Sequence, residues 1–368
     1  MKDIAKKTGL SIATVSKHIN GIRIRADNGI RIQGAIDELG YKVNEIARGL
    51  KTSRTMTIGV LIPSLVNIFS TSIVSAVERI FQQNGYSTFI CDYSSDPALE
   101  ESRFHFLLDK SVDGIIITPT AISSQSIAEA MRLEVPVVAI DQPLSGMDAD
   151  TVLVDNMNAS YQAVEHLIQA RHRKIGIIHG PLSTHTAYER LKGYLRVHVD
   201  YRIPALPVYR KCGDYEMAGG YAQTKILMSE SEPPTALFVT NYEMTLGAVI
   251  ALNEMNVRIP DDLSFIGFDN LQMAMLVKPR LTIVVQPMAK IGEQAAALLL
   301  KRLKGDREDH PYIARLKTEL IPGDSVRQIC SYPARILQEC LEKCLEKCFE
   351  EFLTTLWQGD IIRLRLND

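Results

Sequence analysis

Apolar residues near the N-terminus recur at the spacing of short helices. Ile4 and Ala5 predict one helix that starts near Lys2, and Val15 and Ile19 mark the buried face of a second helix over residues 12–19. Gly9 allows a tight turn between these helices, and Ser11 is placed to cap the second. Small residues where the helices meet, a flexible turn and an apolar underside predict a helix-turn-helix.

A third helix is expected to carry Ile32, Ala35, Ile36 and Leu39 and to end at Gly40. The pair Asn28-Gly29 stands where helix-forming residues would favour its start. Asp27 or Asn28 can cap a helix that begins at Gly29, and Gly at that position costs about 1 kcal/mol relative to Ala. We therefore expect a short third helix.

From Thr57 onward, runs of β-branched apolar residues alternate with helical segments. The expected strands are TIGVLIP, YSTFICDY, GIIITPT, PVVAID, KIGIIHG, PVYRKCG, TALFVT and DLSFIGFD, and helices are expected near 70–84, 98–110, 124–132, 186–198, 216–229, 243–255 and 291–303. This alternation predicts an α/β body with parallel sheets covered on both faces. The series divides near Asp155-Asn156.

After Pro333, apolar residues fall in pairs four positions apart, which predicts an amphipathic C-terminal helix ending near Gly359. Such a helix packs on its own chain or on a partner. The spacing of Cys340, Cys344 and Cys348 also allows a soft metal or inter-chain disulfides. A tail produced by a shifted reading frame is a further alternative. The role of residues 331–368 is left open by the sequence.

Length and composition place the chain among globular proteins of the cytoplasm. Its 368 residues allow two or three domains. No apolar run approaches the ~18 residues of a membrane span, and the N-terminal MKDIAKKTG lacks a secretory apolar segment. We expect no membrane partner. The six cysteines are sparse and unevenly spaced, so reduced thiols are expected.

Charge is distributed unevenly along the chain. Residues 1–55 hold eleven Lys and Arg against five Asp and Glu, although the whole chain has a net charge of −2. A basic module on an acidic body favours nucleic acid as a partner, because neutralised phosphates release counterions. Charge alone is equally consistent with a solvated basic face.

No motif of catalysis or cofactor binding is present. The sequence contains no GxGxxG after a strand, no phosphate-binding GxxxxGK[ST], no GxSxG and no HExxH. The histidines are scattered, and His166 and His172 lack the spacing of metal ligands. We expect no enzyme activity, no cofactor and no metal.

Two N-terminal motifs carry a family resemblance. The first is the SxxTVSxxxN pattern of residues 11–20, and the second is the ELGYxxNxxARGL run from Glu38 to Leu50. With these motifs the chain resembles the LacI/GalR family of bacterial transcription regulators, and the resemblance continues through about residue 330.

The resemblance implies a division into domains. Residues 1–43 would form an all-α helix-turn-helix headpiece and residues 44–56 a hinge helix and linker. Residues 57–330 would form a core like the periplasmic binding proteins, with two Rossmann-like subdomains. The first would span 57–156 with 287–315 and the second 157–286 with 316–330, so that the chain crosses between them three times.

The resemblance also implies how the headpiece contacts a palindromic operator. Ile12, Ala13 and Lys17 would contact base edges in the major groove, and Thr14 and Ser16 would contact phosphates. Leu50 would insert into the minor groove at the palindrome centre. With Asn20 and Asn44, these residues form the predicted DNA-binding set.

An effector site is expected where strands end. A sugar presents hydroxyl groups and one apolar ring face, so its site needs an aromatic platform with carboxylate, amide and guanidinium groups. Residues of these types stand at the strand ends where the family binds effectors, in the crevice between the subdomains. They are Phe69, Asp141, Tyr188, Arg190, Tyr215, Asn241, Asp269 and Gln286.

These observations predict a DNA-binding transcription regulator, a repressor of a carbohydrate-utilisation operon controlled by a small sugar or sugar derivative. It would act as a homodimer or a homotetramer. The alternatives are a sugar-binding sensor or transport component with no DNA role, and a sugar-metabolising enzyme.

Overall fold

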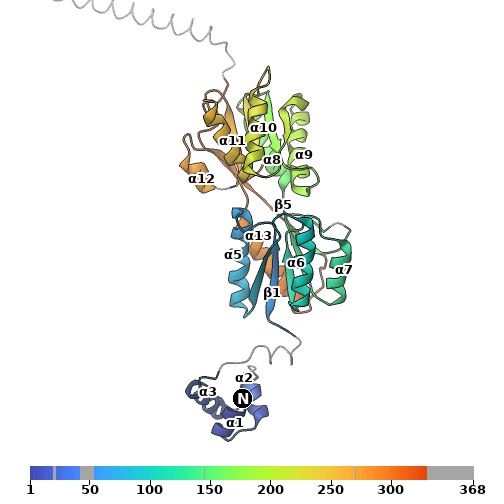
Figure 1. Ribbon diagram of the computed structural model, residues 1–368. Coiled ribbons are helices and arrows are strands. Elements are labelled where there is room, and N and C mark those ends of the chain that lie inside the picture. Colours follow the sequence, from blue (N-terminus) through green and yellow to red (C-terminus); the bar gives the residue numbers. More distant parts are fainter. Residues whose placement is uncertain (20–21, 42–53, 145, 270, 330–368) are drawn as a thin grey trace, which may run out of the picture. The chain divides into compact units, whose positions relative to one another are not determined.

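The computed structural model describes residues 1–19, 22–41, 54–144, 146–269 and 271–329 (Figure 1). The chain divides into two compact units. Unit 1 comprises Met1–Val154 with Pro287–Leu316, and unit 2 comprises Asp155–Gln286 with Lys317–Asp368. The chain therefore passes from one unit to the other three times.

The N-terminal part of unit 1 is a group of three helices, α1 (Lys2–Thr8), α2 (Ile12–Ile19) and α3 (Ala26–Leu39). Their shared core consists of Ile4, Ala5, Val15, Ile32 and Ala35. Gly9 and Gly40 follow α1 and α3 in the left-handed conformation, with φ of 65° and 54°, which glycine adopts without steric cost. The expectation of a short third helix is wrong, because α3 has 14 residues.

The expected start of the third helix is wrong. It begins at Ala26, three residues before Gly29, and neither Asp27 nor Asn28 caps it. Its N-cap residue is Arg25, whose side chain makes no capping hydrogen bond. Tertiary contacts hold α3 instead: Arg31 donates a hydrogen bond to the carbonyl oxygen of Thr8. Packing against α1 outweighs the low helix propensity of Gly29.

The rest of unit 1 is a parallel six-stranded sheet with helices on both faces. The strand order is β11 (Ile313–Leu316), β5 (Asp150–Val154), β4 (Val137–Ile140), β3 (Gly114–Ile117), β1 (Thr57–Ile62) and β2 (Ser87–Asp92). Successive residues of β1 point to opposite faces of the sheet and so belong to different cores. Val60 packs with α5 (Ile68–Gln83) and α13 (Met288–Leu303). Leu61 packs with α6 (Pro97–Asp109) and α7 (Ser124–Arg132). In Figure 1, α5 and α13 accordingly lie together on one side of the sheet and α6 and α7 on the other.

Unit 2 repeats this design with one antiparallel strand. Its sheet order is β12 (Glu319–Ile321), β10 (Thr282–Val285), β9 (Ser264–Phe268), β8 (Ala236–Val239), β6 (Ile175–His179) and β7 (Arg210–Cys212). Only β12, which pairs with β10, runs antiparallel among these described strands. One face packs on α8 (Asn156–Gln169) and α9 (His185–Asp200), and the other on α10 (Met217–Met228), α11 (Tyr242–Glu254) and α12 (Leu271–Leu276).

Several elements were not expected from the sequence. They are β5, α8, α12, β11 and β12. The expected strand PVYRKCG is also divided, because Pro207–Tyr209 form a 3₁₀ turn and the strand β7 is confined to Arg210–Cys212. The predicted C-terminal helix lies outside the described residues. The predicted all-parallel character holds for unit 1, whereas the strand that closes unit 2 runs the other way.

Candidate functional site

The helix expected to contact DNA is oriented by a cap and a buried residue. The Ser11 Oγ atom accepts a hydrogen bond from the backbone N–H of Thr14 at 3.1 Å, which confirms Ser11 as the cap. Val15 is completely buried in the headpiece core. These two contacts determine which face of α2 points outward.

The residues predicted to read base edges lie on the outward face of α2. Ile12, Ala13 and Lys17 are exposed, and Ile12 keeps 49% of its surface accessible although it is apolar. The predicted phosphate contacts Thr14 and Ser16 are half-buried beside them. Their arrangement gives the exposed face of α2 one apolar end and one cationic end. Asn20, Asn44 and Leu50 lie outside the described residues.

The sheet of unit 2 brings several predicted effector residues together. We call Arg190, Tyr215, Asn241, Asp269 and Gln286 the strand-end cluster. Asp269 and Gln286 follow the neighbouring parallel strands β9 and β10 at their carboxyl ends. The two side chains are buried, and the amide of Gln286 donates to both carboxylate oxygens of Asp269 at 3.0 Å.

That pairing fixes the orientation of the Gln286 amide. Its Nε2 must face the carboxylate, so its Oε1 points away and, although buried, has no hydrogen-bond partner among the residues that the structure describes. Buried acceptors in native proteins are nearly always satisfied. The Oε1 atom of Gln286 is therefore an acceptor available to a donor from outside the chain.

Arg190 reaches the cluster from α9 and is held by three elements. Its Nε donates to Asn156 Oδ1 at 2.8 Å, and its Nη1 donates to the carbonyl oxygen of Thr240 at 2.5 Å. The guanidinium carbon lies 4.0 Å from the centre of the Phe268 ring. This cation–π contact and the two hydrogen bonds keep a buried cation in one geometry.

Tyr215 and Asn241 form the other side of the cluster. Asn241 caps α11 through its Oδ1 and donates from Nδ2 to the carbonyl oxygen of Tyr215 at 3.1 Å. The Tyr215 hydroxyl lies 3.0 Å from the hydroxyl oxygens of Thr184 and Thr186. A Cβ at Gly180 would lie 2.1 Å from the Tyr215 ring, so only glycine leaves room for that ring. Local packing thus locks the phenol in place.

A neutral histidine lies beside this side of the cluster. His179 ends β6, is buried, and has its Nδ1 2.7 Å from the carbonyl oxygen of Gly180. Burial lowers the pKa of His179, so the ring is neutral at pH 7 and donates from Nδ1.

The remaining predicted effector residues are not among the residues that the sheet of unit 2 brings together. Tyr188 is on α9 but is 53% exposed, with the Lys192 ammonium 5.7 Å from its ring centre. Phe69 and Asp141 belong to unit 1. Phe69 is the second residue of α5 and packs partly on the sheet, and Asp141 follows β4 in the left-handed conformation with φ of 69°.

Sequence reasoning missed the residues that support the cluster. Asn156, Thr240 and Phe268 hold Arg190, and Thr184 and Thr186 hold Tyr215. Phe268 directly precedes Asp269, so a search for aromatic residues at strand ends would have found it. Asn156 begins α8, a helix that was not expected, and nothing local to it indicates a role.

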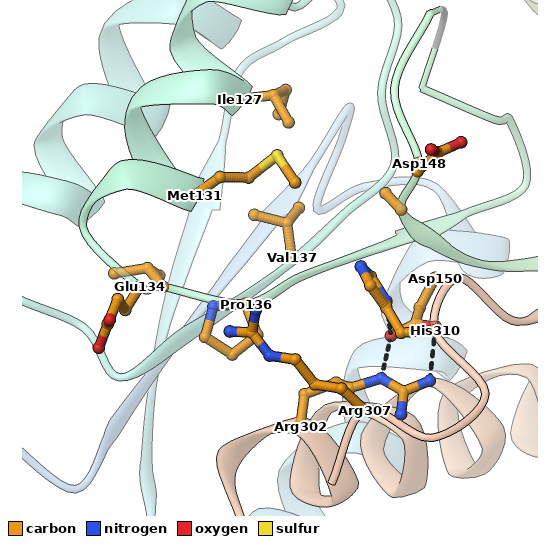
Figure 2. Close-up of a pocket in the computed structure, with 12 residues that line it drawn as sticks. Ile127, Met131, Glu134, Pro136, Val137, Asp148, Asp150, Arg302, Arg307 and His310 are labelled. Carbon is orange, nitrogen blue, oxygen red and sulfur yellow. Dashed lines mark hydrogen bonds and ion pairs between the residues drawn. The ribbon is translucent and has the colours of Figure 1, made fainter. Parts of the chain in front are cut away.

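Unit 1 contains a separate small pocket of about 60 Å³ at the starts of β4 and β5 (Figure 2). Its floor is apolar, formed by Ile127, Met131 and Val137. Beside the floor, Arg302 makes a two-pronged ion pair with the fully buried Asp150, at 2.6 and 2.9 Å. Burial alone would raise the pKa of Asp150, but the hydrogen bonds from Arg302 and from the Tyr312 amide lower it overall. None of the predicted effector residues lines this pocket.

The described residues contain no group of three or more His, Cys, Asp or Glu side chains placed to hold a metal ion. None of the helices they form is both long and apolar enough to span a membrane.

Comparison with known proteins covers both parts of the chain. Residues 1–44 match the family described as bacterial regulatory proteins, lacI family, and residues 164–326 match the periplasmic binding protein-like domain. The HTH-type transcriptional repressor PurR of Actinobacillus pleuropneumoniae serotype 3 (strain JL03) is 32% identical over 331 residues, which are 89% of this chain and 98% of that protein. Catabolite control protein A of Priestia megaterium is 33% identical over 83% of this chain and 93% of its own length.

Solved structures give the same picture. A Lac repressor dimer bound to operator and the anti-inducer ONPF aligns with a TM-score of 0.78 and 27% identity, over 88% of this chain and 98% of its own. A LacI family transcriptional regulator from Enterococcus faecium with bound ribose aligns with a TM-score of 0.68 and 28% identity, over 74% of this chain and 100% of its own. These relatives are transcriptional regulators, which confirms the prediction that the chain is not an enzyme.

Proposed function

The chain belongs to the LacI family of bacterial regulatory proteins and is a DNA-binding transcriptional repressor, and from this premise we propose that it controls a carbohydrate-utilisation operon in response to a small sugar or sugar derivative. The family resemblance and the fold of headpiece and two-sheet core are confirmed. Because residues 1–44 match the DNA-binding family, a regulator is favoured over a sugar-transport component and over an enzyme.

The observation that carries the effector proposal is the buried Oε1 atom of Gln286 beside Asp269. Sugar hydroxyls are both donors and acceptors, so one hydroxyl can donate to this oxygen while a neighbouring hydroxyl donates to the carboxylate. Arg190 supplies a fixed cation, and the aromatic rings of Tyr215 and Phe268 lie at the same strand ends. The ribose bound to the Enterococcus faecium relative supports this ligand class.

Effector binding must favour one conformation of the core in order to change DNA affinity. We propose that the strand-end cluster, together with Tyr188 and with Phe69 and Asp141 of unit 1, provides that differential binding. We further propose a homodimer acting on a palindromic operator in the cytoplasm. The operator-bound Lac repressor dimer supports this arrangement.

A thermal-shift screen of monosaccharides and disaccharides against nucleobases tests the ligand class, and Asp269→Ala tests the site. Loss of the buried charge-assisted hydrogen bonds is expected to weaken binding of the identified sugar by several kcal/mol and to leave operator binding intact. The matched control is Asp324→Ala, since Asp324 lies on the surface of unit 2 in an exposed pair with Arg280. A wild-type response to the sugar in Asp269→Ala would place the effector elsewhere.

A further inference from the structure

Residues 54–56, the described end of the segment that joins the headpiece to the core, are bound by the carboxylate of Asp113. Residues 54–56 directly precede β1, and the lacI-family match ends at residue 44. The Oδ1 atom of Asp113 accepts a hydrogen bond from the backbone N–H of Thr55 at 2.8 Å, and its Oδ2 accepts one from the N–H of Met56 at 3.0 Å. Two consecutive amides are therefore bound to one side chain.

Further bonds fix the same segment. The Thr55 hydroxyl lies 3.0 Å from Asp113 Oδ1 and 2.9 Å from the carbonyl oxygen of Ser111. Asp113 is in turn tied to the sheet, because its own N–H donates to the carbonyl oxygen of Thr57 at 2.8 Å. The carboxylate thus connects the end of the linker to the loop before β3.

The backbone of Met56 shows that this conformation is imposed. Its φ is 52°, in the left-handed region that residues other than glycine seldom occupy. Such a conformation persists where the surroundings hold it. Here the bond from the Met56 N–H to Asp113, and the bond from the Ser87 N–H to the Met56 carbonyl oxygen at 2.8 Å, hold it from both sides.

A second connection ties the linker to a long helix. The guanidinium of Arg54 donates from Nη2 to the carbonyl oxygen of Leu303 at 2.7 Å, and Leu303 is the last residue of α13. This helix begins at Met288, two residues after Gln286 of the strand-end cluster. In the sequence, α13 therefore begins just after Gln286 and ends at Leu303, the residue that accepts the hydrogen bond from Arg54.

We propose that Asp113 is a positioning residue for DNA binding, which clamps Thr55 and Met56 so that the linker leaves the core at one fixed place. The inference rests on the proposed function, because it assigns the clamp a role only in a chain that binds DNA. Without the clamp, the linker must be ordered during binding, and specific affinity falls because that ordering costs entropy. Non-specific binding depends on phosphate charge and is unaffected.

The test compares Asp113→Ala with Asp96→Ala in the full chain. Asp96 is a matched control, because its carboxylate also accepts hydrogen bonds from two consecutive amides of unit 1, those of Ala98 and Leu99. The probe is a palindromic duplex that the wild-type chain selects from random DNA, titrated by fluorescence anisotropy. We expect Asp113→Ala to bind it at least about tenfold more weakly. We expect Asp96→Ala to stay within about twofold of wild type, and both variants to bind a scrambled duplex like wild type.

A structural readout keeps the test decisive. Hydrogen exchange at the Thr55 and Met56 amides should accelerate in Asp113→Ala and not in Asp96→Ala. Asp113→Asn retains the size of the side chain but sets an NH₂ group against one amide, so an intermediate loss of affinity is expected even if the alanine variant folds poorly. Equal affinity of the Asp113 variants and Asp96→Ala for the selected duplex would overturn the inference. Failure of the wild type to select any palindrome would instead contradict the proposed function.

Discussion

Lys17 and Val15 lie two positions apart on α2, with Val15 completely buried and Lys17 exposed. Burial of Val15 was predictable from helical periodicity, and so was the exposure of Lys17. The hydrogen bond that the Thr14 N–H donates to the Ser11 Oγ was predictable as well, since Ser is a preferred cap. Local rules suffice here because the cap joins residues three positions apart and the buried face of a helix follows from its own periodicity.

The first prediction concerns Lys17→Ala. A lysine at this exposed site can reach guanine O6 and N7, so its removal should cost about 1–3 kcal/mol and relax the preference at one base pair in each half-site. Affinity measurements on operators carrying each single base change provide the test. An equal loss over all sequences would show instead that Lys17 contacts a phosphate.

The second prediction concerns the pH dependence of stability. His172 is completely buried, with Nδ1 2.9 Å from Thr235 Oγ1 and Nε2 3.1 Å from the Arg327 carbonyl oxygen. Burial lowers the pKa of His172 to about 4, whereas histidine in an unfolded chain has a pKa near 6.5. The unfolded state therefore binds a proton first as the pH falls.

Stability should accordingly be full above about pH 6.5 and decline toward about pH 4, with His172 contributing about 3 kcal/mol of the loss. Urea unfolding of wild type and His172→Gln across this range tests the assignment. The variant should be less stable at pH 7 and lose less on acidification. Parallel pH profiles for the two proteins would contradict the role of His172.

The effector residues show where residue-scale reasoning stops. Asp269 and Gln286 were found because carboxyl ends of parallel strands share one edge of a sheet. Their mutual pairing, and the stacking of Arg190 on Phe268, depend on residues far apart in the chain. Periodicity carries no information about such partners.

At the scale of elements, the clearest error lies in α3. Its expected start at Gly29 followed from propensity, but the helix begins at Ala26 and includes Gly29, and the burial of Ile32 and Ala35 in the headpiece core stabilises it. The helix α8 was missed although Ala163, Val164 and Leu167 have helical spacing. Short β11 and β12 could not be predicted, because their pairing with β5 and β10 bridges distant parts of the chain.

The third prediction belongs to the linker. Leu50 lies outside the described residues, and its insertion into the minor groove stays a prediction. Leu50→Ser should abolish specific operator binding while leaving the melting temperature and effector affinity unchanged. Val199→Ser, which alters an exposed apolar residue of unit 2, is the control and should bind operator normally. Unchanged operator affinity in Leu50→Ser would remove Leu50 from the interface.

At the scale of the whole molecule, two predominantly parallel sheets were predictable from the alternation of apolar runs and helices. The antiparallel β12 of unit 2 was not, since strand direction is set by the path of the returning chain. The points where the chain passes between units, after Val154, Gln286 and Leu316, involve no distinctive composition. The first point followed from the division of the strand and helix series near Asp155-Asn156, whereas the two later points came from the family resemblance.

The fourth prediction concerns assembly. If the apolar stripe predicted for residues 331–368 pairs between chains, removal of these residues should lower the oligomer mass in sedimentation and preserve effector binding. A tail that covers its own chain would instead leave the subunit number constant and reduce solubility on deletion. Repeating the sedimentation with reductant tests the disulfide alternative for Cys340, Cys344 and Cys348.

The central claim is that this chain represses transcription by binding a specific operator, and that a bound sugar changes its affinity for that operator. The most direct test is to sequence genomic DNA captured by the full chain and titrate the enriched duplex with and without sugars from the screen. The account predicts a palindromic site beside carbohydrate-utilisation genes, with an affinity that one sugar changes in wild type but not in Asp269→Ala. Capture of DNA without a shared sequence, or a palindrome whose affinity no sugar alters, would contradict it.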